Sequence, residues 1–450
     1  MLIQFTIENF LSFKEENTLN LLATTDNKHK HHLLANKKKK SILRTAALYG
    51  ANGSGKSNMI RAMGFAQNLI VDGRRPEQRT GVTPFKLDKS YWKKPCRFEF
   101  VINYQDTIYT YGFVVDEKEV QEEWLFAIYN VKEVLLFERL TTKNGKIKVE
   151  IGPSLAKQKT KKKQFIKFIA EGTRPNNLLL HELYEKNVTE IMPLITWFRS
   201  VLTIIGPDSS YRDLIFDAHL DKQFLNFMGG FLKAADTGVD GIITEKIEFN
   251  PEKLFGEMPE PLKSKLTNIK ANERLLFSTP DGRRFAMLRE ENDELTLLKL
   301  KARHKLSDAG GHIDFEIENE SDGTRRLMDL LPALLHSKSS EKVYLIDEID
   351  RSMHPLLSKM FLQAYLDDKN CGRGQLIITT HESQLLDRKL LRRDEIWFAE
   401  KDKSGGSHMY SLAEFKIRND LKLGKGYLDG RFGAIPFFGD LDNLYGQDGE

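Results

Sequence analysis

The stretch Gly50-Ala51-Asn52-Gly53-Ser54-Gly55-Lys56-Ser57 follows the pattern G-x-x-x-x-G-K-S and decides the fold of this 450-residue chain. An apolar run at residues 46–49 precedes it, and apolar residues follow it with helical spacing at Met59, Ile60, Met63, Ala66, Leu69 and Ile70. Glycines let successive backbone N–H groups surround a di- or triphosphate, and the following helix adds the positive end of its dipole. The order strand, loop, helix therefore predicts a phosphate-binding loop rather than an ordinary glycine-rich turn.

Each residue type in this loop has an expected role. The ammonium of Lys56 is expected to reach the β- and γ-phosphates, and the hydroxyl of Ser57 is expected to ligate Mg²⁺, which prefers oxygen ligands. The loop itself is expected to bind the nucleotide through Asn52, Gly53, Ser54 and Gly55. ATP with Mg²⁺ is therefore the expected ligand pair.

A second apolar stretch ends in two carboxylates. Residues 343–346 are consecutively apolar and lead directly into Asp347-Glu348. Such a run indicates a strand buried on both faces, as in a parallel sheet, rather than a surface strand that happens to end in acids. Asp347 is expected to hold Mg²⁺, and Glu348 is expected to polarise the water that attacks the γ-phosphate.

Asp347 lies 291 residues after Lys56, so a large insertion separates the two halves of the site. Before Asp347, Ser321-Asp322-Gly323 opens a helix with leucines on its buried side. Ser321 is interpreted either as a plain N-cap or as a signature serine. In the second interpretation, the Ser321 hydroxyl, the Gly323 backbone and the helix N-terminus bind the γ-phosphate of ATP held by another protomer. The position 26 residues before Asp347 favours the signature.

Two further polar residues follow the acidic pair. Asp350 occupies the position of a D-loop aspartate, and His381 ends the apolar stretch 375–380. A histidine at a strand end is commonly structural. The spacing of 34 residues after Asp347 favours a switch histidine that donates a hydrogen bond to the γ-phosphate.

Composition and charge fit an ordinary soluble protein, with 40% hydrophobic and 29% charged residues. Lys and Arg number 68 against 64 Asp and Glu, so the net charge of +4 does not demand a polyanionic partner. Two lysine-rich runs, at 28–40 and 157–163, are expected to be solvated, with phosphate-backbone contact as the alternative. His29, His31 and His32 are likewise expected to lie in a solvated loop rather than to bind a metal.

No uncharged apolar run approaches the roughly 18 residues that a membrane span needs. The N-terminus lacks the basic and then apolar pattern of a secretion signal. Cys96 and Cys371 lie far apart in sequence and are expected to be reduced thiols. We therefore expect a cytoplasmic protein without a membrane partner.

The chain divides into three expected parts. Residues 1–152 hold the phosphate loop and, from 96 onward, an alternating pattern that predicts an antiparallel meander. Residues 153–293 are expected to form a mainly helical, compact insertion for assembly or partner contact, because several prolines and the lack of sustained heptads argue against a long coiled coil. Residues 294–450 are expected to return to strands and complete the nucleotide fold.

With these motifs in place, the chain resembles the ABC-type ATPases of the SMC, RecF and OLD group. Within that group it is most similar to AAA-like ATPases of bacterial phage-defence and abortive-infection systems, of the RloA and AbiL kind. The stretches that carry the resemblance are 2–13, Glu320-Ser321-Asp322-Gly323-Thr324-Arg325-Arg326, Asp347-Glu348-Ile349-Asp350, 418–420 and 425–436. The likeness covers about residues 1–140 and 295–450.

The resemblance implies an α/β P-loop NTPase fold of the ABC/SMC type, with a mixed sheet, an antiparallel meander and the helical insertion. It also implies a homodimer or higher oligomer in which each ATP lies between the phosphate loop of one subunit and the signature of the next. Its N-terminal strand and turn would pack near the base and sugar. No glutamine is assigned to a Q-loop, since neither Gln105 nor Gln121 has a distinguishing context.

Three functions follow from the resemblance. The leading hypothesis is an ATP hydrolase that senses infection and regulates a partner effector, a TOPRIM-like nuclease, in antiphage defence. The first alternative is a RecF- or SMC-like ATPase for DNA repair or maintenance, with the lysine runs on nucleic acid. The second is an OLD-like nuclease in which Asp440 and Asp442 mimic a D-x-D pair, although the 69 residues after His381 are too few for that domain.

Overall fold

The computed structural model describes residues 1–34, 40–129, 132–142, 144–156, 161–247, 274–279, 282–289, 295–307, 310–367, 369, 372–416 and 422–436. The chain forms two compact units. The first contains Met1–Ile204, Ser337–Ile349 and Leu366–Glu450, and the second contains Ile205–His336 and Asp350–Tyr365.

A largely parallel sheet lies at the centre of the first unit, with the strand order β11-β17-β18-β5-β19-β20. Every residue of its three central strands is buried, which is why they are short apolar runs in the sequence. β20 pairs antiparallel with β19, so the sheet is mixed. The bounds are β5 (Thr45–Tyr49), β11 (Leu202–Ile205), β17 (Val343–Ile346), β18 (Gln375–Thr379), β19 (Ile396–Lys401) and β20 (Ser407–Ser411).

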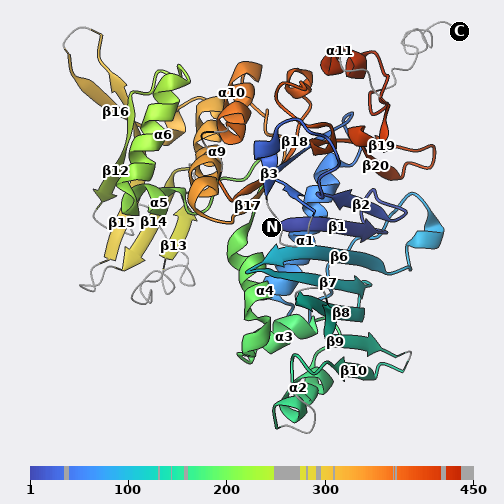
Figure 1. The fold of residues 1–450 in the computed structure, drawn as a ribbon. Helices are drawn as coiled ribbons and strands as arrows, with labels where there is room; N and C mark the ends of the chain where they lie inside the picture. Colours follow the sequence, from blue (N-terminus) through green and yellow to red (C-terminus); the bar gives the residue numbers. More distant parts are fainter. Residues whose placement is uncertain are drawn as a thin grey trace, which may run out of the picture. The chain divides into compact units, whose positions relative to one another are not determined.

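A second sheet of the same unit is antiparallel throughout, in the order β10-β9-β8-β7-β6-β1-β2. Its meander, β6 to β10, continues from β1 in Figure 1 and confirms the prediction for residues 96–152. The bounds are β1 (Leu2–Glu8), β2 (Asn17–Asn20), β6 (Cys96–Tyr104), β7 (Thr107–Val115), β8 (Val120–Tyr129), β9 (Lys132–Thr141) and β10 (Ile147–Ile151).

Helix α1 (Lys56–Asp72) buries the face that its apolar spacing predicts. Its apolar residues share one core with Phe5 and Phe98 of the antiparallel sheet and Leu48 of the parallel sheet. The remaining elements of this unit are η1 (Lys30–His32), β3 (Leu33–Leu34), β4 (Ile42–Leu43), η2 (Lys89–Tyr91), α2 (Lys161–Gly172), α3 (Leu179–Glu185), η3 (Thr189–Ile191), α4 (Met192–Thr196), η4 (Trp197–Val201), η7 (Ser383–Leu385), η8 (Arg393–Glu395), η9 (Leu412–Glu414) and α11 (Leu423–Leu428).

The second unit combines helices with a sheet in the order β12-β15-β14-β13, and β16 pairs with β15. Helix α9 (Asp322–Ser339) contains Pro332 and buries Leu327, Leu330, Leu331 and Leu334, as its sequence predicts. Leu335, the fifth leucine expected on that face, is only half-buried. The other elements are α5 (Leu214–Leu220), α6 (Lys222–Ala234), β12 (Gly241–Ile247), β13 (Arg274–Ser278), β14 (Arg284–Arg289), β15 (Leu295–Lys305), β16 (His312–Glu316), η5 (Ile317–Asn319) and α10 (Pro355–Leu366).

The helical character expected for residues 153–293 needs a correction. Helices dominate its described part up to Ala234, but β12, β13 and β14 follow within the same range. These strands are amphipathic and pair with one another or with β15, a partner that local pattern does not reveal. The strands expected in 294–319 are confirmed by β15 and β16, and the three-part division itself stays a prediction.

No helix within the described ranges is both long and apolar enough to cross a membrane. Cys96 is buried and is a free thiol, as expected. Cys371 lies outside the described residues, as do residues 35–39 and 157–160 of the lysine runs, the tail segment 418–420 and the Asp440-Leu441-Asp442 stretch.

Candidate functional site

The phosphate loop connects β5 to α1 and depends on glycine. Gly55 immediately precedes the helix with φ 114°, and a Cβ at this position would lie 2.3 Å from the Ser407 Oγ. Gly53 also has a positive φ, of 74°. Residues other than glycine are strained at these positive φ angles, so the path of the loop backbone requires glycine at both positions.

Lys56 is the first residue of α1 and is buried. Its Nζ donates hydrogen bonds to the carbonyl oxygens of Gly50 at 2.7 Å and Ala51 at 3.0 Å. The cation therefore lies against the loop in which phosphate contacts are expected.

Three oxygen-bearing side chains meet beside the loop. The Ser57 hydroxyl donates to Asp347 Oδ1 at 3.0 Å, and the Thr379 hydroxyl donates to the same oxygen at 2.5 Å. Ser57 lies in α1, Asp347 directly follows β17, and Thr379 is the last residue of β18. Asp347 is only 2% exposed. Hydroxyl and carboxylate oxygens suit Mg²⁺, so this donor set fits the cation expected from the sequence.

Glu348 follows Asp347 in a left-handed conformation, with φ 49°. Its backbone N–H donates to the Thr379 hydroxyl oxygen at 2.8 Å. Thr379 thus positions both members of the acidic pair. A non-glycine residue held in this region of φ/ψ space costs about 1–3 kcal/mol, which the surrounding hydrogen bonds must offset.

The strand register brings the motif ends to one edge of the sheet. Ile346 of β17 pairs with Ile378 of β18, and Thr379 pairs with Leu48 of β5. The phosphate loop, the acidic pair and His381 therefore all follow the carboxyl ends of adjacent parallel strands. His381 is exposed, two residues beyond Thr379.

Two serines missed by the sequence analysis also support the loop. Ser407 Oγ lies 2.7 Å from the carbonyl oxygen of Ser54 and 2.8 Å from the Ser12 hydroxyl, which also accepts from Asn58 at 2.8 Å. The N-terminal turn thus contacts the phosphate loop. Nothing in the sequence distinguishes these serines, because their contact arises from the pairing of distant strands.

The signature residues lie in the second unit. Ser321 accepts a hydrogen bond from the Thr324 backbone N–H at 3.1 Å and is therefore the N-cap of α9. A Cβ on Gly323 would lie 2.6 Å from the carbonyl oxygen of Ser352, so glycine permits the helix to approach the D-loop. Asp350, in that loop, accepts through its carbonyl from Met353 at 3.1 Å.

A cavity of about 300 Å³ lies in the second unit near the start of α9. Its arginines are balanced by acids: Arg284 contacts Asp329 at 3.1 Å, and Arg351 contacts Asp208 at 2.6 Å. Burial raises the pKa of Asp329, against the opposing effect of Arg284. The cavity is therefore lined by paired charges, and it carries no assignment of its own.

Comparison with protein families gives a clear result. The family described as "AAA domain, putative AbiEii toxin, Type IV TA system" matches residues 46–247 and 250–387. The chain belongs to this family. The first matched range contains the phosphate loop of the AAA domain, and the second contains Ser321, Asp347, Glu348 and His381.

Solved structures similar to this AAA domain protein include three SMC head domains. The first is the SMC head domain from Thermotoga maritima, with 13% identity over 92% of this chain and 99% of that chain and a TM-score of 0.36. The second is the SMC head bound to the C-winged helix domain of ScpA, with 14% identity over 91% of this chain and 97% of that chain and a TM-score of 0.38. The third is the SMC head with an extended coiled coil bound to the C-terminal domain of ScpA derived from Pyrococcus furiosus, with 14% identity over 91% of this chain and 96% of that chain and a TM-score of 0.37. No curated protein was found to match.

The sites predicted from sequence divide between the two units of the AAA protein. The first unit brings together the phosphate loop, Ser57, Asp347 and Glu348, with His381 at the same sheet edge. The second unit contains Ser321, Gly323 and Asp350. The Q-loop remains unassigned, since Gln121 lies in β8 and donates to Asp116 at 2.8 Å.

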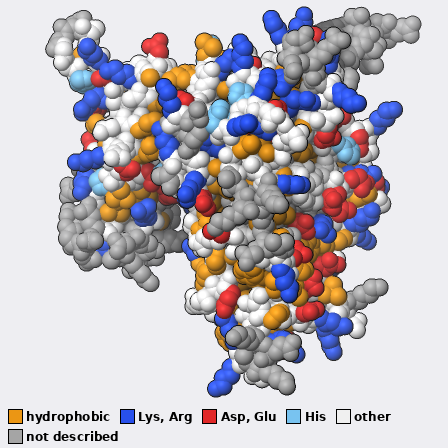
Figure 2. Space-filling model, in the orientation of Figure 1, with side chains coloured by type: hydrophobic (Ala, Val, Ile, Leu, Met, Phe, Trp, Pro, Cys, Tyr) orange, Lys and Arg blue, Asp and Glu red, His pale blue; other side chains and the backbone are white. Residues whose placement is uncertain are grey.

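The described basic side chains on the face drawn in Figure 2 do not gather into one patch. On the face drawn in Figure 2, the described Lys and Arg side chains are scattered among Asp and Glu side chains. Of the lysine runs, residues 35–39 and 157–160 lie outside the described residues, and residues 161–163 begin α2.

Proposed function

We propose that this AAA domain protein binds ATP with Mg²⁺ and hydrolyses it to ADP and phosphate, in sites completed by a second copy of the chain. The observation that carries the proposal is that two hydroxyls donate to one oxygen of Asp347: that of Ser57, the second residue after the last glycine of the phosphate loop, and that of Thr379.

In this proposal the first unit supplies binding and chemistry. Lys56 and the N–H groups of residues 52–55 bind the phosphates, and Ser57 and Asp347 hold the cation. The bound Mg²⁺ would neutralise charge on the phosphates. The Glu348 carboxylate accepts the proton of the attacking water, and His381 hydrogen-bonds the γ-phosphate.

The second unit supplies the signature to a partner's nucleotide. Ser321, the Gly323 backbone and the N-terminus of α9 form a group of donors at the positive end of an 18-residue helix. Asp350 belongs to the loop against which Gly323 packs and would lie at the same contact. A C2 dimer would then contain two composite sites, each with one loop and one signature.

Substituting Lys56 by alanine tests the nucleotide site. The Lys56→Ala protein is expected to bind ATP about 100-fold more weakly, since one charge-assisted contact contributes up to about 3 kcal/mol. Isothermal titration with ATP and Mg²⁺ measures this change. Lys401→Ala, an exposed lysine at the end of β19, is the matched control and should bind normally. Equal affinities of the two variants would overturn the assignment of the loop.

The finer proposal is that ATP turnover regulates a partner nuclease in antiphage defence. It is supported by the family description, which names a putative toxin of a type IV toxin–antitoxin system, and by the resemblance to phage-defence ATPases. Cells carrying the protein with its adjacent genes should show fewer phage plaques than cells carrying the Lys56→Ala form. Protection that is independent of Lys56, or salt-dependent DNA binding without any effector partner, would favour the DNA-repair alternative.

A further inference from the structure

Three histidines gather at the short helix η1, away from the phosphate loop. Each of His29, His31 and His32 offers one ring nitrogen, and these atoms all lie within 4.8 Å of one another. The rings of His29 and His32 are stacked with centroids 4.9 Å apart, and His31 meets His32 edge to face at 4.4 Å. Such a cluster of imidazoles is unusual for a solvated loop, and that prediction is wrong for His32, which is only 1% exposed.

The hydrogen bond of His29 fixes which of its nitrogens is available. Its Nε2 lies 2.9 Å from the carbonyl oxygen of Arg388. A carbonyl only accepts, so Nε2 carries the proton and Nδ1 has the lone pair. The residue is held in a left-handed conformation with φ 45°, an uncommon geometry for a non-glycine residue.

His32 is oriented by a carboxylate. Its Nδ1 lies 2.9 and 3.0 Å from the two oxygens of Glu395, whose side chain is fully buried. With Nδ1 engaged by Glu395, the remaining nitrogen is Nε2. Metal-binding histidines characteristically pair their second nitrogen with a carboxylate or a backbone carbonyl. His32 is paired with the carboxylate of Glu395, and His29 with the carbonyl of Arg388.

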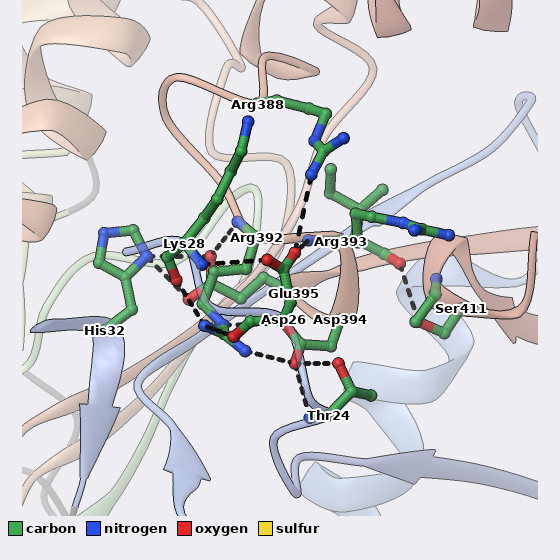
Figure 3. A network of polar contacts seen from close by, with 12 residues as sticks. Thr24, Asp26, Lys28, His32, Arg388, Arg392, Arg393, Asp394, Glu395 and Ser411 are labelled. Carbon is green, nitrogen blue, oxygen red and sulfur yellow. Dashed lines mark hydrogen bonds and ion pairs between the residues drawn. The ribbon is translucent and has the colours of Figure 1, made fainter. Parts of the chain in front are cut away.

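The loop that carries the histidines is held by a network of polar contacts, drawn in Figure 3. Arg392 donates to the carbonyl oxygens of Asp26 at 2.9 Å and Lys28 at 2.5 Å, and both Asp394 oxygens accept from Arg392. Asp394 in turn accepts from Thr24 at 2.7 Å. The histidine backbone is therefore fixed by residues more than 350 positions later in the chain.

Two of the arginines near the cluster are paired with acids. Arg392 forms an ion pair with Asp394 at 2.8 Å, and Arg388 lies 3.9 Å from Asp26. Lys28 and Lys30 flank His29 in the sequence, and Arg44 approaches the carbonyl oxygen of His31 at 3.4 Å. The nearby carboxylates of Asp26, Asp394 and Glu395 offset part of this positive charge.

We propose that His29, His31 and His32 form a binding site for one transition-metal cation of the zinc class, with His29 coordinating through Nδ1 and His32 through Nε2. Imidazole nitrogens suit Zn²⁺ and its neighbours better than Mg²⁺ or Ca²⁺. Tetrahedral ligands at about 2.0–2.1 Å from Zn²⁺ lie ~3.3 Å apart. The three ring nitrogens lie within 4.8 Å of one another, and the stacked rings of His29 and His32 must rotate for their lone pairs to meet at one ion. A water molecule would complete the coordination.

The position of the site indicates a structural role. The histidines precede β3 and β4, and β4 leads directly into β5 and the phosphate loop. The backbone of Arg44, between β4 and β5, donates to the His32 carbonyl oxygen at 2.9 Å. The cluster lies before residue 46, the first residue of the family match.

Metal analysis of the full-length, tag-free protein tests the proposal. After equilibration with Zn²⁺ in excess Mg²⁺ and removal of loose metal, mass spectrometry should find about one zinc per chain, a stoichiometry set by three imidazoles sharing one ion. The His31→Gln protein should bind Zn²⁺ at least ~10-fold more weakly. His312→Gln is the control, because His312 is an exposed histidine paired with Asp240 in the other unit.

A second variant separates ligation from folding. Glu395→Gln keeps an oxygen that accepts from the Arg392 backbone N–H, but it removes the carboxylate that orients the His32 ring. This substitution should lower zinc affinity about 10- to 100-fold. X-ray absorption of the loaded wild-type protein should show imidazole ligands. Equal zinc content in the wild-type and His31→Gln proteins, or uptake of inorganic phosphate in place of zinc, would overturn the proposal. ATP affinity should be the same in the histidine variants, which keeps this test independent of the proposed ATPase function.

Discussion

A Glu348→Gln protein is expected to bind ATP with nearly unchanged affinity and to hydrolyse it about 1000-fold more slowly, because a positioned general base contributes 10²–10⁴ in rate. The amide of glutamine has the shape of the carboxylate but cannot accept the proton of the attacking water. The backbone contact with Thr379 stays in place, since it involves the Glu348 N–H rather than its side chain.

Single-turnover hydrolysis measured beside nucleotide titration checks this expectation. Glu341→Gln is a matched control, because Glu341 lies at the opposite end of β17 from the phosphate loop. The control should retain wild-type turnover. Normal turnover by the Glu348→Gln protein would show that another group accepts the proton.

The second large effect is expected at Ser321. In the proposed dimer, a Ser321→Arg substitution places a bulky side chain where the partner's nucleotide binds and removes a hydroxyl donor. Turnover should fall about 100-fold or more, the size of effect seen when one donor to a transition-state oxyanion is lost. ATP binding to the subunit's own phosphate loop should be unaffected, because Lys56 and Ser57 belong to the first unit.

The N-cap role of Ser321 requires its own control. Its hydroxyl accepts from the Thr324 N–H, and loss of such a cap costs roughly 0.5–2 kcal/mol of stability. Ser321→Asn preserves capping ability, whereas Ser321→Arg does not. Thermal unfolding of both variants, compared with their turnover, separates a destabilised α9 from an obstructed site. Full activity of a stable Ser321→Arg protein would remove the signature from the account.

The parts of the fold that the sequence predicts well are those with strong local signals. The glycine spacing from 50 to 55 and the helical apolar face of α1 follow from backbone geometry and burial. Residues 343–346 form a fully buried parallel strand, as their unbroken apolar character indicates. The meander of β6 to β10 follows from the alternation of apolar and polar residues along its strands.

Contacts set by tertiary pairing were not predictable. Thr379 ends a buried strand like many other threonines, and only the register of β18 against β17 and β5 brings it to Asp347. His32 sits in a polar, lysine-rich stretch, yet Glu395, 363 residues later, receives it in a buried position. Ser321 shows a further limit of the sequence. A serine that caps a helix and a serine that belongs to a nucleotide-binding signature look the same in it.

The most direct test of the composite site is a mixture of the Lys56→Ala and Ser321→Arg proteins. Each variant alone should be nearly inactive, but in a mixed dimer one site combines an intact loop with an intact Ser321. For random pairing of equal amounts the account predicts about a quarter of wild-type turnover, since half the dimers are mixed and each has one of two sites restored. Turnover that stays at the level of the separate variants, while native mass spectrometry shows that mixed dimers form, would contradict it.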